Sequence, residues 1–219
     1  MSGEIFKVVL LGESGVGKTS IISQFVDQIF QQDLQISTGG TFSSKTLIYG
    51  NNKQIKFEIW DTAGQERYRS LTTMFYKEAN AAILVYDITV EDSFEQLQSY
   101  WFTQVKEASP ENIILVICAN KSDLLKQEKV DEEVARKFAE DNNAIFCSTS
   151  AKNAHGINDL FFQIAKKYTG CDDVRIKKDD EDIPIEEEEN QNENDNKIGT
   201  VKISTIKTEN NNERKKKCC

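Results

Sequence analysis

The sequence predicts an α/β fold, in which a mostly parallel six-stranded sheet has one antiparallel edge strand and carries helices on both faces. Two observations lead to this prediction. Over residues 1–170, short apolar runs alternate with longer amphipathic segments, a pattern typical of parallel sheets covered by helices. Two of the runs are separated only by the turn residues "GNNK", which indicates a hairpin and therefore one antiparallel pair.

The elements follow in chain order. The apolar run "FKVVLLG" predicts a buried first strand, and a helix is expected from Lys18 to about Asp27. The hairpin strands are "TLIYG" and "QIKFEIW", and later strands are "AAILVYD", "IILVICA" and "AIFCSTS". Apolar residues at helical spacing predict the remaining helices in "VEDSFEQLQSYWFTQVKEAS", "VDEEVARKFAEDN" and "INDLFFQIAKKYTG", the last stopping at Gly170.

Length and composition predict one domain followed by a tail. The 219 residues suffice for a domain at 1–170, and the acidic, polar segment 171–219 is expected to be a disordered tail. A net charge of −9 argues against nucleic-acid binding, which depends on Lys and Arg. Neither a secretory signal nor an apolar run near the ~20 residues of a membrane span is visible. Cys118 and Cys147 lie in apolar runs and predict buried thiols in a reducing cytosol, whereas His155 predicts a surface loop.

The segment "GESGVGKT" at 12–19 predicts a phosphate-binding loop between the first strand and the first helix. Its glycines let backbone N–H groups turn toward phosphate oxygens, and the helix N-terminus favours an anion. Lys18 can reach the terminal phosphates, and the Thr19 hydroxyl can bind Mg²⁺. The residues expected to contact the nucleotide here are Gly12, Ser14, Gly15, Val16, Gly17, Lys18, Thr19 and Ser20.

The segment "WDTAG" at 60–64 follows the third predicted strand. Asp61, at a strand end across from Thr19, is placed to hold a metal-bound water. Gly64 allows a backbone N–H to approach a terminal phosphate. Gln65 comes next, and its carboxamide is too weak a base for proton abstraction but can orient an attacking water. Gln65 is therefore the candidate catalytic residue.

The segments "NKSD" at 120–123 and "TSAK" at 149–152 follow the last two strands and predict base recognition. The Asp123 carboxylate can accept two hydrogen bonds from the ring N–H and exocyclic amine of guanine, an edge that adenine lacks. Asn120 is expected to tie this loop to the phosphate loop, and the Lys121 stem to lie over the base. The Ala151 N–H can meet the guanine O6. The remaining candidates here are Ser150 and Lys152.

These four motifs, in this order and spacing, resemble the Ras-like small GTPases, which have the P-loop NTPase fold. "WDTAGQERYRSL", "ILVYDIT" and the two terminal cysteines resemble the Rab family, and "GESGVGKTS" with "IKFEIWDTAGQERY" leans toward its early-endosomal subgroup. The resemblance covers about residues 5–170 and the last two residues. It implies a monomeric GTPase that binds GTP, GDP and Mg²⁺, hydrolyses GTP slowly, and is stimulated by an activating protein that supplies an arginine.

The resemblance also carries partner-binding positions over. Phe30 matches the aromatic residue that stacks on the base, while Phe42, Trp60 and Phe75 match the triad that Rab proteins present to effectors. The family usually has Tyr at the last of these positions. Simple core packing is the alternative for the triad, above all for Trp60. Further partners implied are an exchange factor, a prenylation escort and a GDP-dissociation inhibitor.

The first switch segment, "ISTGGTF" at 36–42, departs from the family pattern, in which a Thr binds Mg²⁺ in the GTP state. Counting without gaps from Thr19 or back from Phe42 puts Ser37 at the metal position. Matching the letters "ST" puts Thr38 there instead. Ser37 is preferred on spacing, and Thr38 stays open.

The resemblance implies that Cys218 and Cys219 are both geranylgeranylated. One lipid chain gives marginal membrane binding, whereas two chains anchor. The basic run 214–217 lies beside them, and each positive charge can add about 1 kcal/mol near an anionic leaflet. The expected location is the cytoplasmic face of an endosomal or other vesicle membrane, in exchange with the cytosol. There the protein would regulate vesicle trafficking through effectors that bind its GTP state.

Two alternatives come from other classes of protein. A binding module could hold GTP without hydrolysing it, but Gln65 and the intact "DTAG" argue against this. A soluble nuclear-transport GTPase also has an acidic tail, but that kind lacks terminal cysteines.

Overall fold

A seven-stranded sheet forms the centre of the structure, a computed structural model that describes residues 4–32, 41–62 and 77–178. These residues all belong to the first of two compact units, Met1–Pro184 and Ile185–Cys219. The strand order is β6-β5-β4-β1-β3-β2-β7. The strands are β1 (Glu4–Leu11), β2 (Thr41–Tyr49), β3 (Lys53–Asp61), β4 (Ala81–Asp87), β5 (Ile114–Asn120), β6 (Ile145–Ser148) and β7 (Val174–Ile176).

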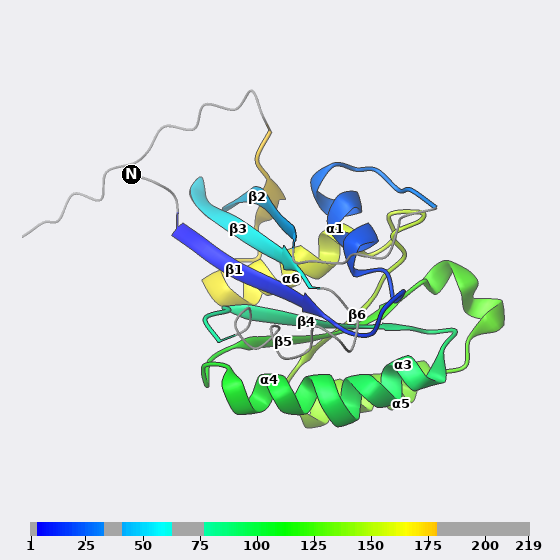
Figure 1. Cartoon of the computed structure of the whole chain (residues 1–219). Coiled ribbons are helices and arrows are strands. Elements are labelled where there is room, and N and C mark those ends of the chain that lie inside the picture. Colours follow the sequence, from blue (N-terminus) through cyan, green and yellow to red (C-terminus); the bar gives the residue numbers. More distant parts are fainter. Residues whose placement is uncertain (1–3, 33–40, 63–76, 179–219) are drawn as a thin grey trace, which may run out of the picture. The chain divides into compact units, whose positions relative to one another are not determined.

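The sheet is mostly parallel, with its antiparallel pairs at one side. β6, β5, β4, β1 and β3 run parallel to one another (Figure 1). β2 pairs antiparallel with β3, and β7 pairs antiparallel with β2. The predicted fold class is therefore confirmed. The strand count differs, because β7 adds a seventh strand beyond Gly170 and β2 is not the edge. Three residues are too few for an alternating pattern to reveal a strand.

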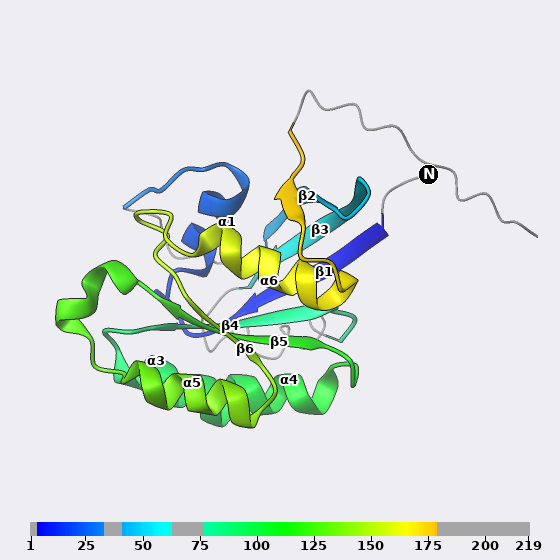
Figure 2. The same cartoon turned by 180° about the vertical axis from the view of Figure 1, so that it is seen from behind.

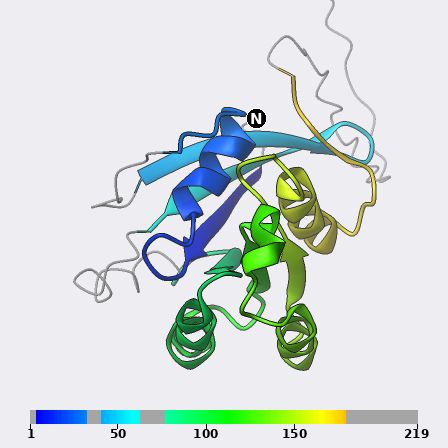
Figure 3. The same ribbon diagram turned by 90° about the vertical axis from the view of Figure 1, so that its right-hand side faces the viewer.

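Helices cover both faces of the sheet, as predicted (Figures 2 and 3). One face packs against α1 and α6, and the other against the helical segment α3–η2–α4 and against α5. The helices are α1 (Lys18–Val26), α3 (Glu91–Gln96), the π-helical η2 (Leu97–Trp101), α4 (Phe102–Ala108), the 3-10 helix η3 (Ser122–Gln127), α5 (Glu132–Asp141) and α6 (Ile157–Thr169).

Alternation along the central strands creates the two faces. In β4, Ile83 and Val85 point toward α1 and α6, while Leu84 and Tyr86 point toward the opposite helices, and all four are fully buried. Strands buried on both faces are near-continuous apolar runs, which explains why "AAILVYD" contains no polar residue before its last position. That last position lies at the carboxyl end of the sheet.

The rings of Phe25 and Phe161 stack with centroids 3.8 Å apart and planes 15° apart, which joins α1 to α6. α1 begins at the end of the phosphate loop, so this contact holds in place the helix that follows the loop. α6 ends at Gly170, whose left-handed conformation (φ 70°) and N–H bond to the Lys166 carbonyl form the predicted helix stop.

The predicted helix at 90–109 is continuous but contains one widened turn. The Phe102 N–H bonds to the Leu97 carbonyl, five residues earlier, which is the hydrogen bond of a π-helix. Leu97 and Trp101 of this turn are buried in the core, at 0% and 1% exposure. The sequence pattern predicts the helix but not the π turn, because apolar spacing over one turn does not distinguish the two.

The cysteine and histidine predictions also hold. Cys118 and Cys147 are buried free thiols, and burial raises the pKa of each to about 12, so neither is poised to react. His155 is exposed. Among the described residues, no helix is long and apolar enough to cross a membrane.

Candidate nucleotide-binding site

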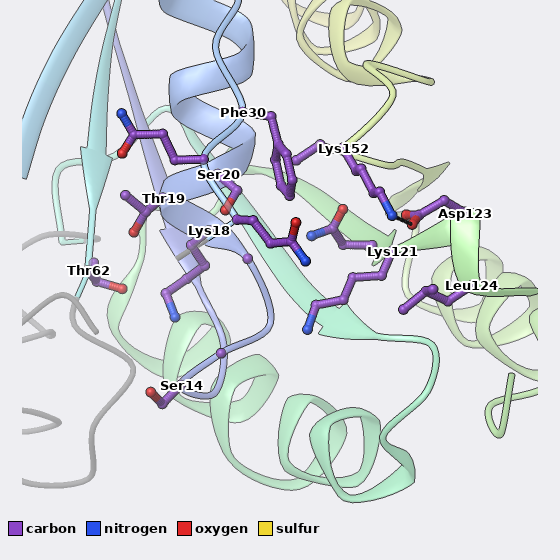
Figure 4. A pocket seen from close by; sticks show the side chains of 16 residues that line it. Ser14, Lys18, Thr19, Ser20, Phe30, Thr62, Lys121, Asp123, Leu124 and Lys152 are labelled. Atoms are coloured by element: carbon purple, nitrogen blue, oxygen red, sulfur yellow. Dashed lines mark ion pairs between the residues drawn. The ribbon is translucent and has the colours of Figure 1, made fainter. Parts of the chain in front are cut away.

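A pocket of about 490 Å³ lies where the carboxyl ends of the parallel strands meet (Figure 4), the usual ligand position in such sheets. All four predicted motifs and the loop after α1 contribute to it. Its lining residues are Ser14, Gly15, Gly17, Lys18, Thr19, Ser20, Phe30, Gln31, Gln32, Thr62, Asn120, Lys121, Asp123, Leu124, Ala151 and Lys152.

The phosphate loop requires glycine at two positions for steric reasons. Gly12 has φ +142°, and a Cβ there would lie 2.2 Å from the Val85 carbonyl oxygen. Gly17 has φ +99°, and its Cβ would lie 2.4 Å from Asn120 Nδ2. Gly17 also precedes α1 without a side-chain cap, so the first N–H groups of that helix stay available to an anion.

Lys18 is buried beneath this loop, with only 6% of its surface exposed. Its Nζ donates to the Gly12 and Glu13 carbonyls at 2.8 and 2.9 Å. Burial lowers the pKa of Lys18 to about 8, although the Asp61 and Glu13 carboxylates act in the opposite direction. A cation that is already desolvated interacts strongly with an incoming phosphate, since water does not screen the charge.

Thr19 and Asp61 meet at the other side of the loop, where the Thr19 hydroxyl donates to Asp61 Oδ2 at 2.5 Å. Asp61 is the last residue of β3 and is 1% exposed. A hydroxyl and a carboxylate side by side are hard oxygen donors, the ligand type that Mg²⁺ prefers. The two residues therefore fit the predicted metal, which would supply positive charge at this end of the pocket.

Asn120 joins the base-binding end of the pocket to the phosphate loop. Its Nδ2 donates to the Val16 carbonyl at 2.8 Å, which is the contact expected from the sequence. The Thr149 hydroxyl donates to Asn120 Oδ1 at 3.1 Å, so both ends of the amide are satisfied. Asn120 is 2% exposed, and a buried, fully bonded amide has one favourable orientation.

Lys121 is held by a residue that the sequence analysis missed. It adopts a left-handed conformation (φ 66°), which is strained for a side chain of this size. Its Nζ lies 2.6 Å from Oδ2 of the buried Asp87, whose Oδ1 accepts bonds from the N–H and hydroxyl of Thr89. Asp87 ends β4 beside Asn120 of β5, and an acidic residue at a strand end was the available signal.

Asp123 lies at the base end of the pocket with the "TSAK" residues. The Ser150 hydroxyl donates to Asp123 Oδ1 at 2.6 Å, and Lys152 Nζ lies 4.0 Å from Oδ2. Figure 4 shows Phe30 and Lys152 on the same side of the pocket as Asp123, away from Ser14 and Lys18. Phe30 and Lys121 both line the pocket, and the prediction that they enclose a planar base stays a prediction.

The structure places some predicted residues beside the pocket rather than on its lining. Gly12, Val16 and Ser150 contribute backbone geometry or hydrogen bonds behind the lining residues. Four lining residues, Gln31, Gln32, Thr62 and Leu124, were not predicted. The buried Thr62 donates from its hydroxyl to the Leu10 carbonyl at 2.6 Å. It lies within "WDTAG", but no role was predicted for it.

Seven predicted residues lie outside the described residues. They are Ser37, Thr38, Gly64, Gln65, Phe75, Cys218 and Cys219. Of the predicted effector triad, Phe42 and Trp60 are described, and their rings meet edge to face with centroids 5.3 Å apart. Phe42 is 49% exposed, so core packing does not account for it.

Comparison with known proteins decides the family. A family model described as the Ras family matches residues 7–170. The chain is 45% identical to human Ras-related protein Rab-22A over 166 residues, 76% of this chain and 84% of the relative. It is 44% identical to Rab-5A of Dictyostelium discoideum over 162 residues, 74% of this chain and 80% of the relative. The tobacco relative RHN1 (Nicotiana plumbaginifolia) is 45% identical over 161 residues, with 74% and 80% coverage.

The chain is a Rab small GTPase of the Ras family. The predicted family and enzyme class are thereby confirmed, since this family binds GTP and GDP and hydrolyses GTP. The relatives also remove the support for a nuclear-transport GTPase. The roles of individual residues in this Rab GTPase stay predictions, for which the geometry above supplies specific tests.

Asp123→Asn should weaken GTP binding at least about a hundredfold and shift the preference to XTP. The variant amide faces the guanine amine with a donor instead of an acceptor, whereas xanthine presents an oxygen there. Competition of GTP and XTP against a labelled nucleotide measures the shift. Glu128→Gln, on the same connection but outside the pocket lining, is the matched control. An unchanged preference for GTP in the Asp123→Asn variant would contradict the assignment of the base site.

Nucleotide affinity should fall as pH rises through 8, because the phosphates favour charged Lys18 while the free protein loses that proton near pH 8. At pH 8.5 about three-quarters of the free protein has a neutral Lys18, so affinity should be about fourfold lower than at pH 7. Titration calorimetry with GDP at the two pH values measures this. Lys18→Arg keeps its charge over this range and should show no such step. Equal affinities for the parent at pH 7 and 8.5 would rule out a lowered Lys18 pKa.

Proposed function

We propose that this Rab GTPase is a membrane-anchored switch that regulates vesicle trafficking through effectors that bind its GTP state. One observation carries most of the proposal. A base-binding end at Asp123 and a phosphate-binding end at Lys18 share one pocket, and the Asn120–Val16 hydrogen bond joins them. A ligand with both a guanine edge and a polyphosphate satisfies both ends, and GTP is that ligand.

The phosphate end supports hydrolysis by positioning and charge neutralisation. Lys18 faces the terminal phosphates, and Thr19 and Asp61 would hold Mg²⁺, which supplies positive charge to the phosphate oxygens when bound. Gly64 would donate its N–H to the terminal phosphate, and Gln65 would orient the attacking water. Hydrolysis by this set is slow until an activating protein adds an arginine.

The effector surface of the proposal lies on β2 and β3. Phe42 and Trp60 are cross-strand neighbours, and Lys7 Nζ lies 5.5 Å from the centroid of the Trp60 ring. The exposed Phe42 ring beside the partly buried Trp60, with an adjacent positive charge, suits a partner that offers an apolar anchor and an acidic rim. Phe75 and the metal ligand Ser37, or Thr38, would complete this surface in the GTP state. An exchange factor and a GDP-dissociation inhibitor would recognise the GDP state.

The tail supplies the membrane anchor in this proposal. A prenylation escort would present Cys218 and Cys219 for lipidation, and two chains anchor where one is marginal. The similarity to Rab-22A and Rab-5A supports an endosomal membrane as the site of action. The protein would act there as a monomer and return to the cytosol after hydrolysis.

Gln65→Leu tests the switch directly. The variant should bind GTP and GDP as the parent does but hydrolyse GTP at least about tenfold more slowly, because leucine orients no water. Phosphate release in a single turnover measures the rate, with and without an activating protein. Gln127→Leu is the matched control, since Gln127 is exposed at the end of η3 and lies off the pocket lining.

The outcomes of that experiment separate the candidate functions. A parent that binds GTP tightly but releases no phosphate in a single turnover would be a binding module. A Gln65→Leu variant that turns over as fast as the parent would remove Gln65 from the mechanism while leaving the GTPase activity intact.

Replacing Cys218 and Cys219 with Ser should release the protein from membranes and leave GDP affinity unchanged, because the pocket residues span only 14–152. Each single replacement should give intermediate attachment, since one chain binds membranes marginally. Fractionation of cells that express full-length variants measures the distribution. Cys171→Ser, which removes a thiol from the folded domain, is the matched control and should pellet like the parent. A double variant that pellets as fully as the parent would show that the two cysteines are not the anchor.

A further inference from the structure

A hydrogen bond connects the π turn to the phosphate loop. Trp101 Nε1 donates to Glu13 Oε1 at 2.9 Å, across 88 residues of sequence. Trp101 is 1% exposed and lies on η2, while Glu13 is the second residue of the phosphate loop. None of the motifs that define the nucleotide pocket includes Trp101, and the proposed hydrolysis uses neither side chain.

Packing alone does not explain this contact. A buried indole N–H needs a hydrogen-bond acceptor, which a neutral group could also supply. Here the acceptor is a carboxylate, and a hydrogen bond to a charged group is about twice as strong as one between neutral groups. The indole is presented from the π turn, whose extra residue changes the angular positions of the side chains that follow it. Such turns cost regular hydrogen bonding and often occur at functional sites.

Glu13 contacts both Trp101 and the phosphate-binding Lys18. The side chain of Glu13 accepts from Trp101, and its own carbonyl accepts from Lys18 Nζ at 2.9 Å. The Glu13 carboxylate also raises the pKa of Lys18 against the effect of burial. Side chains from outside the loop therefore bond to it at Glu13 (Trp101), at Val16 (Asn120) and at Thr19 (Asp61).

We propose that Trp101 is a positioning residue of the phosphate loop, which holds Glu13, and through it Lys18, in the geometry that retains the nucleotide. The proposal rests on the proposed function in one respect, that the retained ligand is a guanine nucleotide.

Release of a fluorescent GDP from the full-length protein tests the proposal. Trp101→Phe keeps an aromatic ring but removes the N–H donor, and should speed GDP release about two- to tenfold. Val105→Ala is the matched control, because Val105 is fully buried in the same core cluster as Trp101 and its side chain has no hydrogen-bond donor. It should lower the thermal midpoint and leave the release rate unchanged. Equal acceleration by both variants would mean that a loosened core, not the hydrogen bond, governs release.

A double-mutant cycle isolates the Trp101–Glu13 bond. Trp101→Phe should speed release much less in a Glu13→Ala background than in the parent, since the acceptor is already gone. Additive effects of the two substitutions would overturn the proposal. A parent that fails to retain GDP would instead contradict the proposed function, so the two failures are distinct.

A second pair of variants covers the case in which Trp101→Phe does not fold. Glu13→Gln keeps an acceptor oxygen within reach of the indole, whereas Glu13→Ala removes it. Release from Glu13→Gln should be slower than from Glu13→Ala, because the amide keeps a weaker, neutral bond to the indole. If both variants release GDP equally fast, the charge of Glu13 and not its bond to Trp101 is what matters, and the proposal fails.

Discussion

The nucleotide pocket depends on one buried hydrogen bond, from Asn120 Nδ2 to the Val16 carbonyl. It joins the loop that follows β1 to Asn120, the last residue of β5. Its geometry explains a constraint on the phosphate loop, since a Cβ at Gly17 would lie 2.4 Å from the same Nδ2. Removing the amide would leave a buried carbonyl unsatisfied and separate the two ends of the pocket.

Two lysines of this pocket are held in place, one by its own burial and the other by a buried carboxylate. Lys18 is nearly inaccessible and its pKa is lowered, while Lys121 is held by the buried carboxylate of Asp87. Both lysines are therefore fixed before a ligand arrives, and the cost of ordering them is met during folding instead of during binding. Both line the pocket, Lys18 at the end proposed for phosphates and Lys121 at the end proposed for the base.

Much of the site could be predicted because its chemistry is local in the sequence. Gly12, Gly17, Lys18 and Thr19 lie within one short segment, and their residue types follow from phosphate geometry. Asp87 ends the predicted strand "AAILVYD", but its role was missed because that role depends on its position beside Asn120 in the neighbouring strand. Register between strands is set by packing across the whole sheet and leaves no mark on a single segment.

The helices and strands likewise divide into those that the sequence predicts and those that it does not. Apolar runs predict β1, β4 and β5 because strands buried on both faces need them. The π turn was not predictable, because one extra residue in a turn leaves the apolar spacing of the helix almost unchanged. β7 was missed because it is short, and because the two residues that pack against the core, Val174 and Ile176, stand among polar neighbours.

The short strand β7 has a consequence for the behaviour of the protein in concentrated solution. Long unpaired edge strands invite pairing between copies of a chain, the first step in many aggregation processes. The sheet ends in the four-residue β6 on one side and the three-residue β7 on the other, whereas β2 has nine residues. By covering Leu47–Tyr49 of β2 with a strand that carries Arg175 at its centre, the chain replaces part of a long edge with a short, charged one. This arrangement lowers the tendency of folded domains to pair through the edges of their sheets.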